Sequence, residues 1–274
     1  MTSIDVDTCE IQRLYIDEHL SLNAVAAALG CSQGVVRRRL IAAGIERRQD
    51  GGVARYIRRD FSGDLNEKAY LIGLRIGDLH VALEGRRSIV VKCTSTRREQ
   101  VDLFRLVFEP YGHVYTDEAT LSMRERQSIG MQVALNLTFE FLLAKHDQVP
   151  EWILASDEPF FAFLGGYVDA EGYFRTYFHP KQSKPLGRLE IRSYDAGLLT
   201  QLGEALNARG ILCPPAQMCV PAGYTNSYDV RSNRDLWRLG VQRRKSLHQL
   251  ITRLDDSVKH ARRRRDMLNV LAVC

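Results

Sequence analysis

Two nine-residue stretches of this chain, residues 71–79 (LIGLRIGDL) and 164–172 (LGGYVDAEG), carry the same pattern. Each has a small residue at its third and seventh positions and an acid at its eighth, Asp78 in the first and Glu171 in the second. Small residues four positions apart lie on one face of a helix and let two backbones approach closely. The pattern therefore predicts a helix–helix interface, here called the seam, made by Gly73, Gly77, Gly166 and Ala170.

The two acids come at the ends of the predicted helices. The negative end of a helix dipole disfavours an acid there, and a lone acid of this kind is usually an ordinary surface carboxylate. Matched positions in two packed helices would instead bring Asp78 and Glu171 together at one end of the seam. Because crowded carboxylates repel each other unless a cation lies between them, we expect a divalent-metal site.

The two stretches resemble the signature helices of the LAGLIDADG homing endonucleases, present as two copies in one chain. The second copy matches more closely, since residues 163–174 keep the small residues, the acid pair and the closing glycine. The first has Ile76 where an acid is common and Leu79 where glycine is usual. The resemblance runs from about residue 66 to the C-terminus. It implies an α+β fold of two pseudo-symmetric αββαββα halves that form a DNA saddle.

Hydrophobic patterning predicts the same order of elements twice. In the first copy, we expect strands near residues 80–83, 88–94, 114 and 131–138, and helices at 97–111 and 139–145. In the second copy, a helix at 158–171 precedes strands at 173–178, 188–193, 218–220 and 227–232, with a helix at 196–210 and more helices at the end. Alternation leaves one polar face on each sheet, which suits either solvent or a major groove of DNA.

The N-terminal residues predict a separate small helical unit. Helices are expected at residues 11–18, 22–29 and 33–42, with Ser21 and Ser32 as N-caps and glycines as stops. The last two resemble a helix-turn-helix, in which Gln33 and Arg37 would face base edges and Arg38 and Arg39 the phosphates. A plain helical bundle with solvated arginines is the alternative. The predicted domains are residues 1–48 (helix-turn-helix), 49–65 (basic linker), 66–150 (first half) and 151–274 (second half).

Composition bounds the partners. The 274 residues allow two or three domains, and a net charge of +5 with six basic clusters favours DNA or RNA. None of the six cysteines forms a C-x-x-C pair, which argues against zinc. No apolar run has the length to span a membrane, so we expect no membrane partner and a cytoplasmic location, nucleoid-associated if the host is bacterial.

The resemblance implies a monomeric enzyme that cuts both strands of a long DNA target. Asp78 and Glu171 would bind Mg²⁺, for which Mn²⁺ would substitute, while Ca²⁺ would bind without fast cleavage. The family also carries a basic residue near each scissile phosphate, for which the candidates are Lys145, Arg243 and Lys245. Contacts to DNA from the sheets are expected from Lys92, Gln132, Asn136, Arg175, Tyr177, Arg188, Arg192 and Arg231.

Two other functions remain open on this scaffold. One is a DNA-binding transcriptional regulator without catalysis, which loss of the acids would indicate; both acids are present, but the imperfect first stretch, with Leu79 in place of glycine, keeps this alternative open. The other is a maturase that binds intron RNA. The mobile-element endonuclease is the preferred interpretation.

Overall fold

The computed structural model describes residues 7–18, 20–45, 56–85, 87–121, 127–178, 180, 184–227 and 229–274. Contacts divide the chain into two units, Met1–Ile57 and Arg58–Cys274. Part of the predicted linker, residues 49–55, lies outside the described residues. The following segment packs on the larger unit, because Arg59 N donates to Tyr111 O at 2.8 Å and Phe61 N to Thr138 Oγ1 at 2.8 Å. None of the described helices is long and apolar enough to cross a membrane.

The N-terminal unit is helical. Helix α1 (Thr8–Gln12) runs into a π-helical turn η1 (Arg13–Asp17), and α2 (Leu22–Ala28) and α3 (Gln33–Ala42) follow. Ser21 Oγ accepts from Ala24 N at 3.1 Å, as predicted, whereas Ser32 precedes α3 without a side-chain cap bond. Gly30, with a φ of 62°, ends α2. The unit has its own core, made of Ile11, Leu14, Tyr15, Leu22, Val25, Ala26, Val36 and Leu40.

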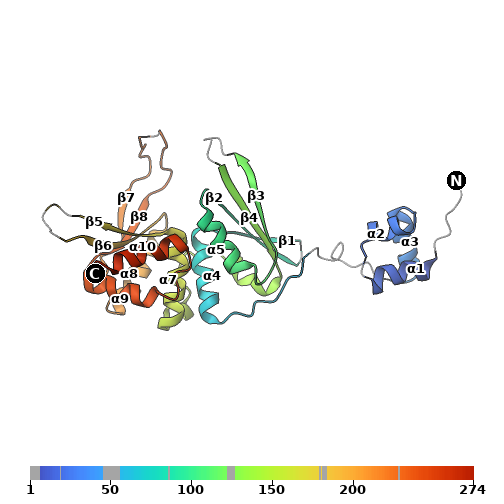
Figure 1. Ribbon diagram of the computed structural model, residues 1–274, viewed down its shortest axis with the longest axis horizontal. Helices are drawn as coiled ribbons and strands as arrows, with labels where there is room; N and C mark the ends of the chain where they lie inside the picture. The colour runs from blue at the N-terminus through green and yellow to red at the C-terminus, as the bar shows by residue number, and fades with distance from the viewer. Residues whose placement is uncertain are drawn as a thin grey trace. The chain divides into compact units, whose positions relative to one another are not determined.

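The larger unit repeats one arrangement twice (Figure 1). Its first half contains α4 (Leu65–Gly77), β1 (His80–Glu84), β2 (Ser88–Ser95), α5 (Arg98–Phe108), β3 (Val114–Leu121), β4 (Gln127–Leu135) and η2 (Leu137–Leu142). Its second half contains α6 (Glu151–Leu154), α7 (Asp157–Glu171), β5 (Gly172–Tyr177), β6 (Leu186–Ser193), α8 (Ala196–Ala208), β7 (Gln217–Val220), β8 (Leu236–Val241), α9 (Arg244–Leu254) and α10 (Ala261–Leu271).

Both halves form a four-stranded antiparallel sheet with equivalent strand orders, β1-β2-β4-β3 and β5-β6-β8-β7. Helices cover one face of each sheet, with α5 on β2, β3 and β4, and α8, α9 and α10 on the second sheet. Helices α4 and α7 pack against each other along the seam, and one continuous core joins the halves through them. The predicted α+β class with two αββαββα halves is therefore confirmed.

Two predicted strands differ from the structure. The strand expected at residues 131–138 ends at Leu135. The strand expected at 227–232 is wrong, because the fourth strand of the second sheet is β8. Residues 221–227 and 229–235 instead form an irregular excursion between β7 and β8, in which Asp229 has a φ of 58° and Thr225 forms an isolated bridge with Arg231. The hydrophobic pattern did not predict β8, because the leucines of β8 and of α9 are spaced as in a helix, and helices were expected in this part of the chain.

Candidate active site

The seam is built around two glycines in equivalent positions. A Cβ added to Gly73 would lie 2.1 Å from Phe163 O and 2.9 Å from Tyr167 N. A Cβ added to Gly166 would lie 2.1 Å from Tyr70 O and 3.0 Å from Leu74 N. In the alignment of the two stretches, Phe163 and Tyr167 are the counterparts of Tyr70 and Leu74, so each helix contacts the other in the same way. The seam therefore has a local pseudo-two-fold axis, with no room for side chains at either glycine.

The axis leads to the two acids. A Cβ on Gly77 would lie 2.3 Å from the Cβ of its counterpart Ala170 and 3.2 Å from Glu171 Cγ. The absence of a side chain at Gly77 lets Glu171 extend across the end of α4, toward Asp78 at the C-cap of that helix. The four predicted interface residues thus meet in the structure, and the two acids lie at the same end of the seam.

The environment disfavours negative charge on both acids. Burial raises the pKa of Asp78 to about 6, against the opposing charge of Arg263. Burial and then the charge of Asp78 raise the pKa of Glu171 to about 7, while the charges of Lys145 and Arg263 lower it. Two carboxylates that lose water and repel each other favour a cation between them.

Each half contributes one cation to this place. Lys145, which follows η2 of the first half, acts on Glu171, the acid of the second. Arg263 of α10, in the second half, acts on both acids. Arg263 Nε is buried and has no hydrogen-bond partner among the described residues. The sequence does not single out Arg263, because it is one of four consecutive arginines and spacing alone does not tell which of them turns inward.

Asp78 has a buried amide partner, Gln100, that Glu171 lacks among the described residues. Gln100 Nε2, on α5, donates to Asp78 Oδ2 at 3.5 Å. The counterpart of Gln100 on α8 is the fully buried Leu198, since Arg97 and Asp195 are the corresponding N-caps. Nearby Cys93 is buried, which together with the charge of Asp78 raises its pKa to about 11 and keeps it a thiol. Gln100 was missed because one polar residue in an amphipathic helix carries no distinctive signal.

Asp169, the other acid of the second stretch, fastens the segment that leads to Arg263. It is 1% exposed, and its Oδ2 accepts from Tyr70 Oη at 2.7 Å, Lys259 N at 2.8 Å and His260 N at 3.1 Å. Burial raises its pKa to about 6, although these bonds and the charge of Arg263 lower it. Asp169 thereby fixes both α4 and the start of α10.

The other predicted basic candidates lie elsewhere. Arg243 is the N-cap of α9, and Lys245 is in the first turn of that helix, both exposed to solvent. Neither contributes to the pKa shifts of Asp78 or Glu171, whereas Lys145 does.

The polar face of the first sheet carries a cross-strand row. His80 pairs with Lys92, Lys92 with Gln132, and Gln132 with Tyr115. Lys92 is exposed and its Nζ lies 3.4 Å from Glu84 Oε1. Asn136, predicted to lie on this face, follows the end of β4 and caps η2: its Oδ1 accepts from Thr138 N at 3.1 Å and its Nδ2 donates to Asp60 at 2.5 Å.

The polar face of the second sheet is richer in arginine. Arg175 and Arg188 are cross-strand partners, and both guanidinium groups lie near the ring of Tyr177, 5.8 Å and 5.6 Å from its centroid. Arg192 lies 5.6 Å from the centroid of Tyr173. Arg231, predicted to lie on this sheet, belongs to the excursion between β7 and β8.

In the N-terminal unit, the predicted base-reading and phosphate-binding residues lie on α3. Gln33, Arg37 and Arg38 are exposed, and Arg39 is partly buried. Arg38 Nε donates to Gly34 O at 3.3 Å within the helix.

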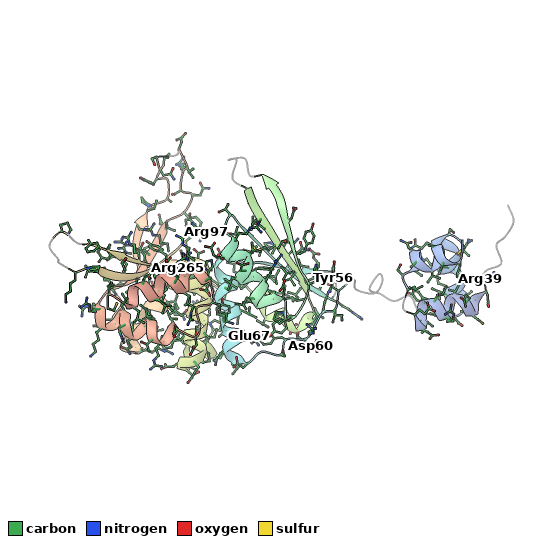
Figure 2. The ribbon with its side chains drawn as sticks, viewed as in Figure 1. Arg39, Tyr56, Asp60, Glu67, Arg97 and Arg265 are labelled. Atoms are coloured by element: carbon green, nitrogen blue, oxygen red, sulfur yellow. The ribbon has the colours of Figure 1, made fainter. Side chains whose placement is uncertain are left out.

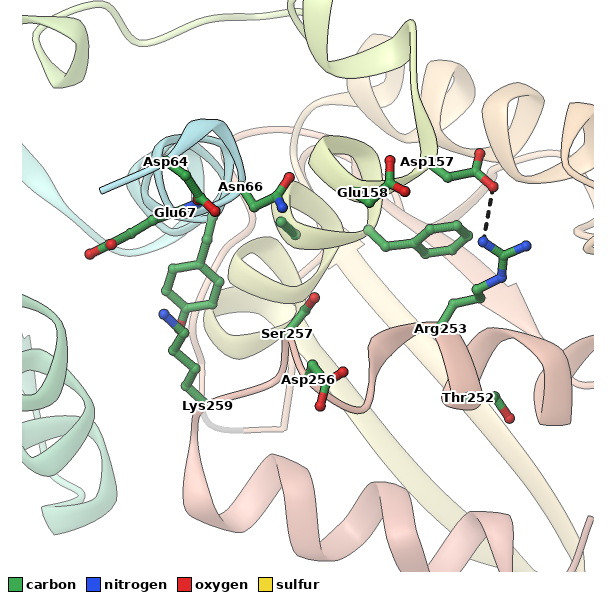
Figure 3. Close-up of a pocket in the computed structure, with 13 residues that line it drawn as sticks. Asp64, Asn66, Glu67, Asp157, Glu158, Thr252, Arg253, Asp256, Ser257 and Lys259 are labelled. Carbon is green, nitrogen blue, oxygen red and sulfur yellow. Dashed lines mark hydrogen bonds and ion pairs between the residues drawn. The ribbon is translucent and has the colours of Figure 1, made fainter. Parts of the chain in front are cut away.

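The opposite end of the seam, where α4 and α7 begin, carries charged side chains of both signs. A cavity of about 510 Å³ opens there between the first turns of α4 and α7 (Figure 3). Its lining includes five carboxylates, Asp64, Glu67, Asp157, Glu158 and Asp256, and two cations, Arg253 and Lys259. Asp157 pairs with Arg253 at 2.9 Å and with Arg209 at 3.0 Å. Figure 2 shows Glu67 at this lower end of the view, whereas Arg97 and Arg265 lie above it.

Comparisons with known proteins gave structural likenesses alone. No protein-family model matches the chain, and no curated protein matches it. The LAGLIDADG homing endonuclease I-GzeII in complex with its DNA target is 10% identical, over 74% of this chain and 87% of that one, with a TM-score of 0.44. The homing endonuclease I-WcaI bound to its DNA recognition sequence is 12% identical, over 74% and 86%, with a TM-score of 0.45. The LAGLIDADG meganuclease I-AabMI bound to uncleaved DNA is 9% identical, over 74% and 89%, with a TM-score of 0.42. These similarities are too low to indicate what this chain does.

Proposed function

We propose that the chain is a sequence-specific, metal-dependent endonuclease that cuts both strands of a DNA duplex, as homing enzymes of mobile elements do. The proposal rests on one observation: Asp78 and Glu171 lie together at the pseudo-two-fold axis. The positive charges of Lys145 from the first half and Arg263 from the second lower the pKa of these acids. A pseudo-two-fold site matches the two-fold relation of the two strands of a duplex.

The donor set fits a hard divalent cation such as Mg²⁺. Both donors are carboxylates. Burial and then the charge of Asp78 raise the pKa of Glu171, and a bound cation would relieve the repulsion between the two groups. Across the described residues no group of three or more His, Cys, Asp and Glu forms a denser site. Mg²⁺ keeps several waters and commonly takes one or two protein carboxylates together with phosphate oxygens, so a sparse site suits it. When bound, it would activate water and stabilise charge on the phosphate.

The chain's own residues then bind and orient the DNA. Lys145 and Arg263 place positive charge beside the acids, where a scissile phosphate needs it. Gln100 holds one carboxylate oxygen of Asp78. The polar faces of the two sheets present side chains to the grooves, and α3 of the N-terminal unit would contact one flank of the target.

The test separates cleavage from binding. Duplexes are selected from a random library with Ca²⁺ and then moved into Mg²⁺ or Mn²⁺, with wild type, Asp78→Asn and Glu171→Gln compared. We expect wild type to cut both strands of a long recovered site, and each variant to bind that site with little change while cleavage falls below detection. Glu84→Gln, at an exposed carboxylate of β1, is the matched control and should cut normally.

Other outcomes would replace the proposal. Double-strand cleavage retained by either acid variant would remove the acids from the chemistry. Tight binding to a defined site without cleavage by wild type would indicate the regulator. Failure to select any duplex, together with retention of structured RNA, would indicate the maturase.

A further inference from the structure

A buried carboxylate interrupts the arginine-rich face of the second sheet. Glu190, in the middle of β6, is 2% exposed although its cross-strand partners Tyr173 and Gly240 lie on the polar face. Its Oε1 accepts from Tyr173 Oη and, at 2.7 Å, from Arg192 Nε, and Arg188 Nη2 lies 3.0 Å from Oε2. A carboxylate that is taken out of water requires such partners, and burial raises its pKa less than these bonds and charges lower it.

The carboxylate immobilises Arg192 without using up its hydrogen-bonding capacity. Arg192 donates to Glu190 through Nε, which leaves both terminal amino groups out of that bond, and its side chain is 46% exposed. The guanidinium also lies near the ring of Tyr173. Arg188 differs, because its side chain is 18% exposed and a terminal nitrogen is the atom that pairs with Glu190.

We infer that Glu190 is a positioning residue that holds Arg192 ready to read a guanine in the half of the target facing β5 and β6; this inference rests on the proposed DNA binding. Arginine contacts O6 and N7 of guanine with two donors, and a guanidinium held in advance loses less entropy on binding. The carboxylate of Glu190, which Arg188 and Arg192 share, weakens the attraction of Arg192 for a phosphate. The neutral edge of a base is not repelled in this way.

A hollow opens next to Glu190 and Arg188, although Arg192 is not part of its lining. This hollow of about 130 Å³ is lined by Arg188, Glu190 and Arg238, and by Gly240, which has no side chain opposite Glu190. Arg192 also pairs across the strands with Arg238, whose Nη2 donates to Gln217 Oε1 at 3.3 Å. The side chains of Arg192 on β6 and Arg238 on β8 are therefore both held by hydrogen bonds within the sheet before any ligand binds.

Among the described residues of the first half, no buried carboxylate holds an arginine in this way. Strand register makes Lys92 the counterpart of Glu190, since His80 pairs with Lys92 as Tyr173 pairs with Glu190. Lys92 meets Glu84 at 3.4 Å with both side chains exposed, and a pair of this kind contributes little to holding a side chain in place. The second half of the target should consequently tolerate fewer base changes than the first.

The experiment selects bound duplexes from a random library with Ca²⁺, so that cleavage plays no part. Wild type, Glu190→Gln, Arg192→Lys and the double variant are compared, with Glu84→Gln as the matched control in the first half. For wild type we expect a guanine at a fixed position of one half-site. Glu190→Gln and Arg192→Lys should each reduce that preference about tenfold or more at that position alone, and the double variant should add little. Glu84→Gln should leave the position unchanged.

Three results would overturn the inference. One is a wild-type site without the guanine, and another is a preference that survives Arg192→Lys. The third is a uniform loss of affinity for all sequences in Glu190→Gln, with a changed salt dependence, because that result indicates a phosphate contact. In each case DNA is still bound and the proposed function stands, whereas a failure to recover any duplex removes both. If Glu190→Gln melts far below wild type, the surface variant Arg192→Lys decides alone.

Discussion

Gly73 and Gly166 occupy equivalent positions on the two sides of the seam, and a methyl group on either would fall 2.1 Å from a carbonyl oxygen of the opposite helix. The two atoms concerned are backbone atoms in the middle of helices, so neither side can give way without moving a whole helix. The position of the acids therefore depends on residues with no chemistry of their own.

We expect Gly73→Ala and Gly166→Ala each to lower the free energy of unfolding by about 1–3 kcal/mol or more, as overpacking does, even though alanine favours a helix. The matched control is Gly197→Ala, in the first turn of α8, where the new Cβ would meet Asp195 Oδ1 at an ordinary 3.5 Å. Urea unfolding measures all three. Equal stability of the seam variants and the control would contradict the close contact.

The three carboxyl groups near the seam's end make stability depend on pH. Asp78 and Asp169 have pKa values raised to about 6, and Glu171 to about 7. The folded state therefore holds their protons more tightly than the unfolded state, so their contribution is full below about pH 4 and is lost as pH rises to about 7. His260 acts in the opposite direction, because burial lowers its pKa.

A comparison of variants isolates the acids from His260. Without divalent cations, Asp78→Asn should melt at a higher temperature than wild type at pH 8, and the difference should shrink at pH 4.5. Adding Mg²⁺ at pH 8 should raise the melting temperature of wild type and leave the variant nearly unchanged. A difference that does not depend on pH would contradict the raised pKa of Asp78.

Gln100 should matter to one strand only. Gln100→Leu removes the donor to Asp78 and gives the first half the residue that its counterpart, Leu198, already supplies in the second. If the proposed activity holds, we expect the cut assisted by Asp78 to slow about tenfold, equivalent to about 1.4 kcal/mol, so that nicked duplex accumulates. Gel analysis with each strand labelled separately measures this, and equal slowing of both strands would contradict the asymmetry.

The bond between Tyr70 and Asp169 should show energetic coupling. Tyr70→Phe leaves a buried carboxylate with two backbone donors, and we expect a loss of about 1–3 kcal/mol in unfolding free energy. Asp169→Asn should reduce this cost, and a double-mutant cycle gives the coupling directly. Additive effects would contradict the hydrogen bond.

The N-terminal unit should add binding energy without chemistry. If α3 contacts one flank of the target, Arg37→Ala and Arg38→Ala should each weaken binding and lower the salt dependence, while the cleavage rate at saturating protein stays the same. Binding measured on a full-length target and on one lacking that flank provides the control. Identical losses on both targets would contradict a flank contact.

Sequence alone predicted the seam, the two acids and almost every element, because repeated small residues and alternation are local signals. The expected helix at residues 158–171 is α7, Asp157–Glu171. Strand β8 was missed since two buried residues, Leu239 and Val241, are too few to reveal a period of two beside a helical leucine pattern. Arg263 and Gln100 become visible only when α10 and α5 are placed in space, because tertiary packing and not spacing brings them to the acids.

The buried hydrogen bond between Tyr70 and Asp169 has no equivalent on the other side of the seam, where the counterparts of these residues are Phe163 and Ile76. The two halves are therefore complementary and not equivalent. A dimer of two first halves would bury two tyrosine hydroxyls against isoleucine, and a dimer of two second halves would bury two carboxylates against phenylalanine. Pairing of either half with a copy of itself would therefore leave buried polar groups without partners. The Tyr70–Asp169 bond therefore specifies the pairing of a first half with a second half.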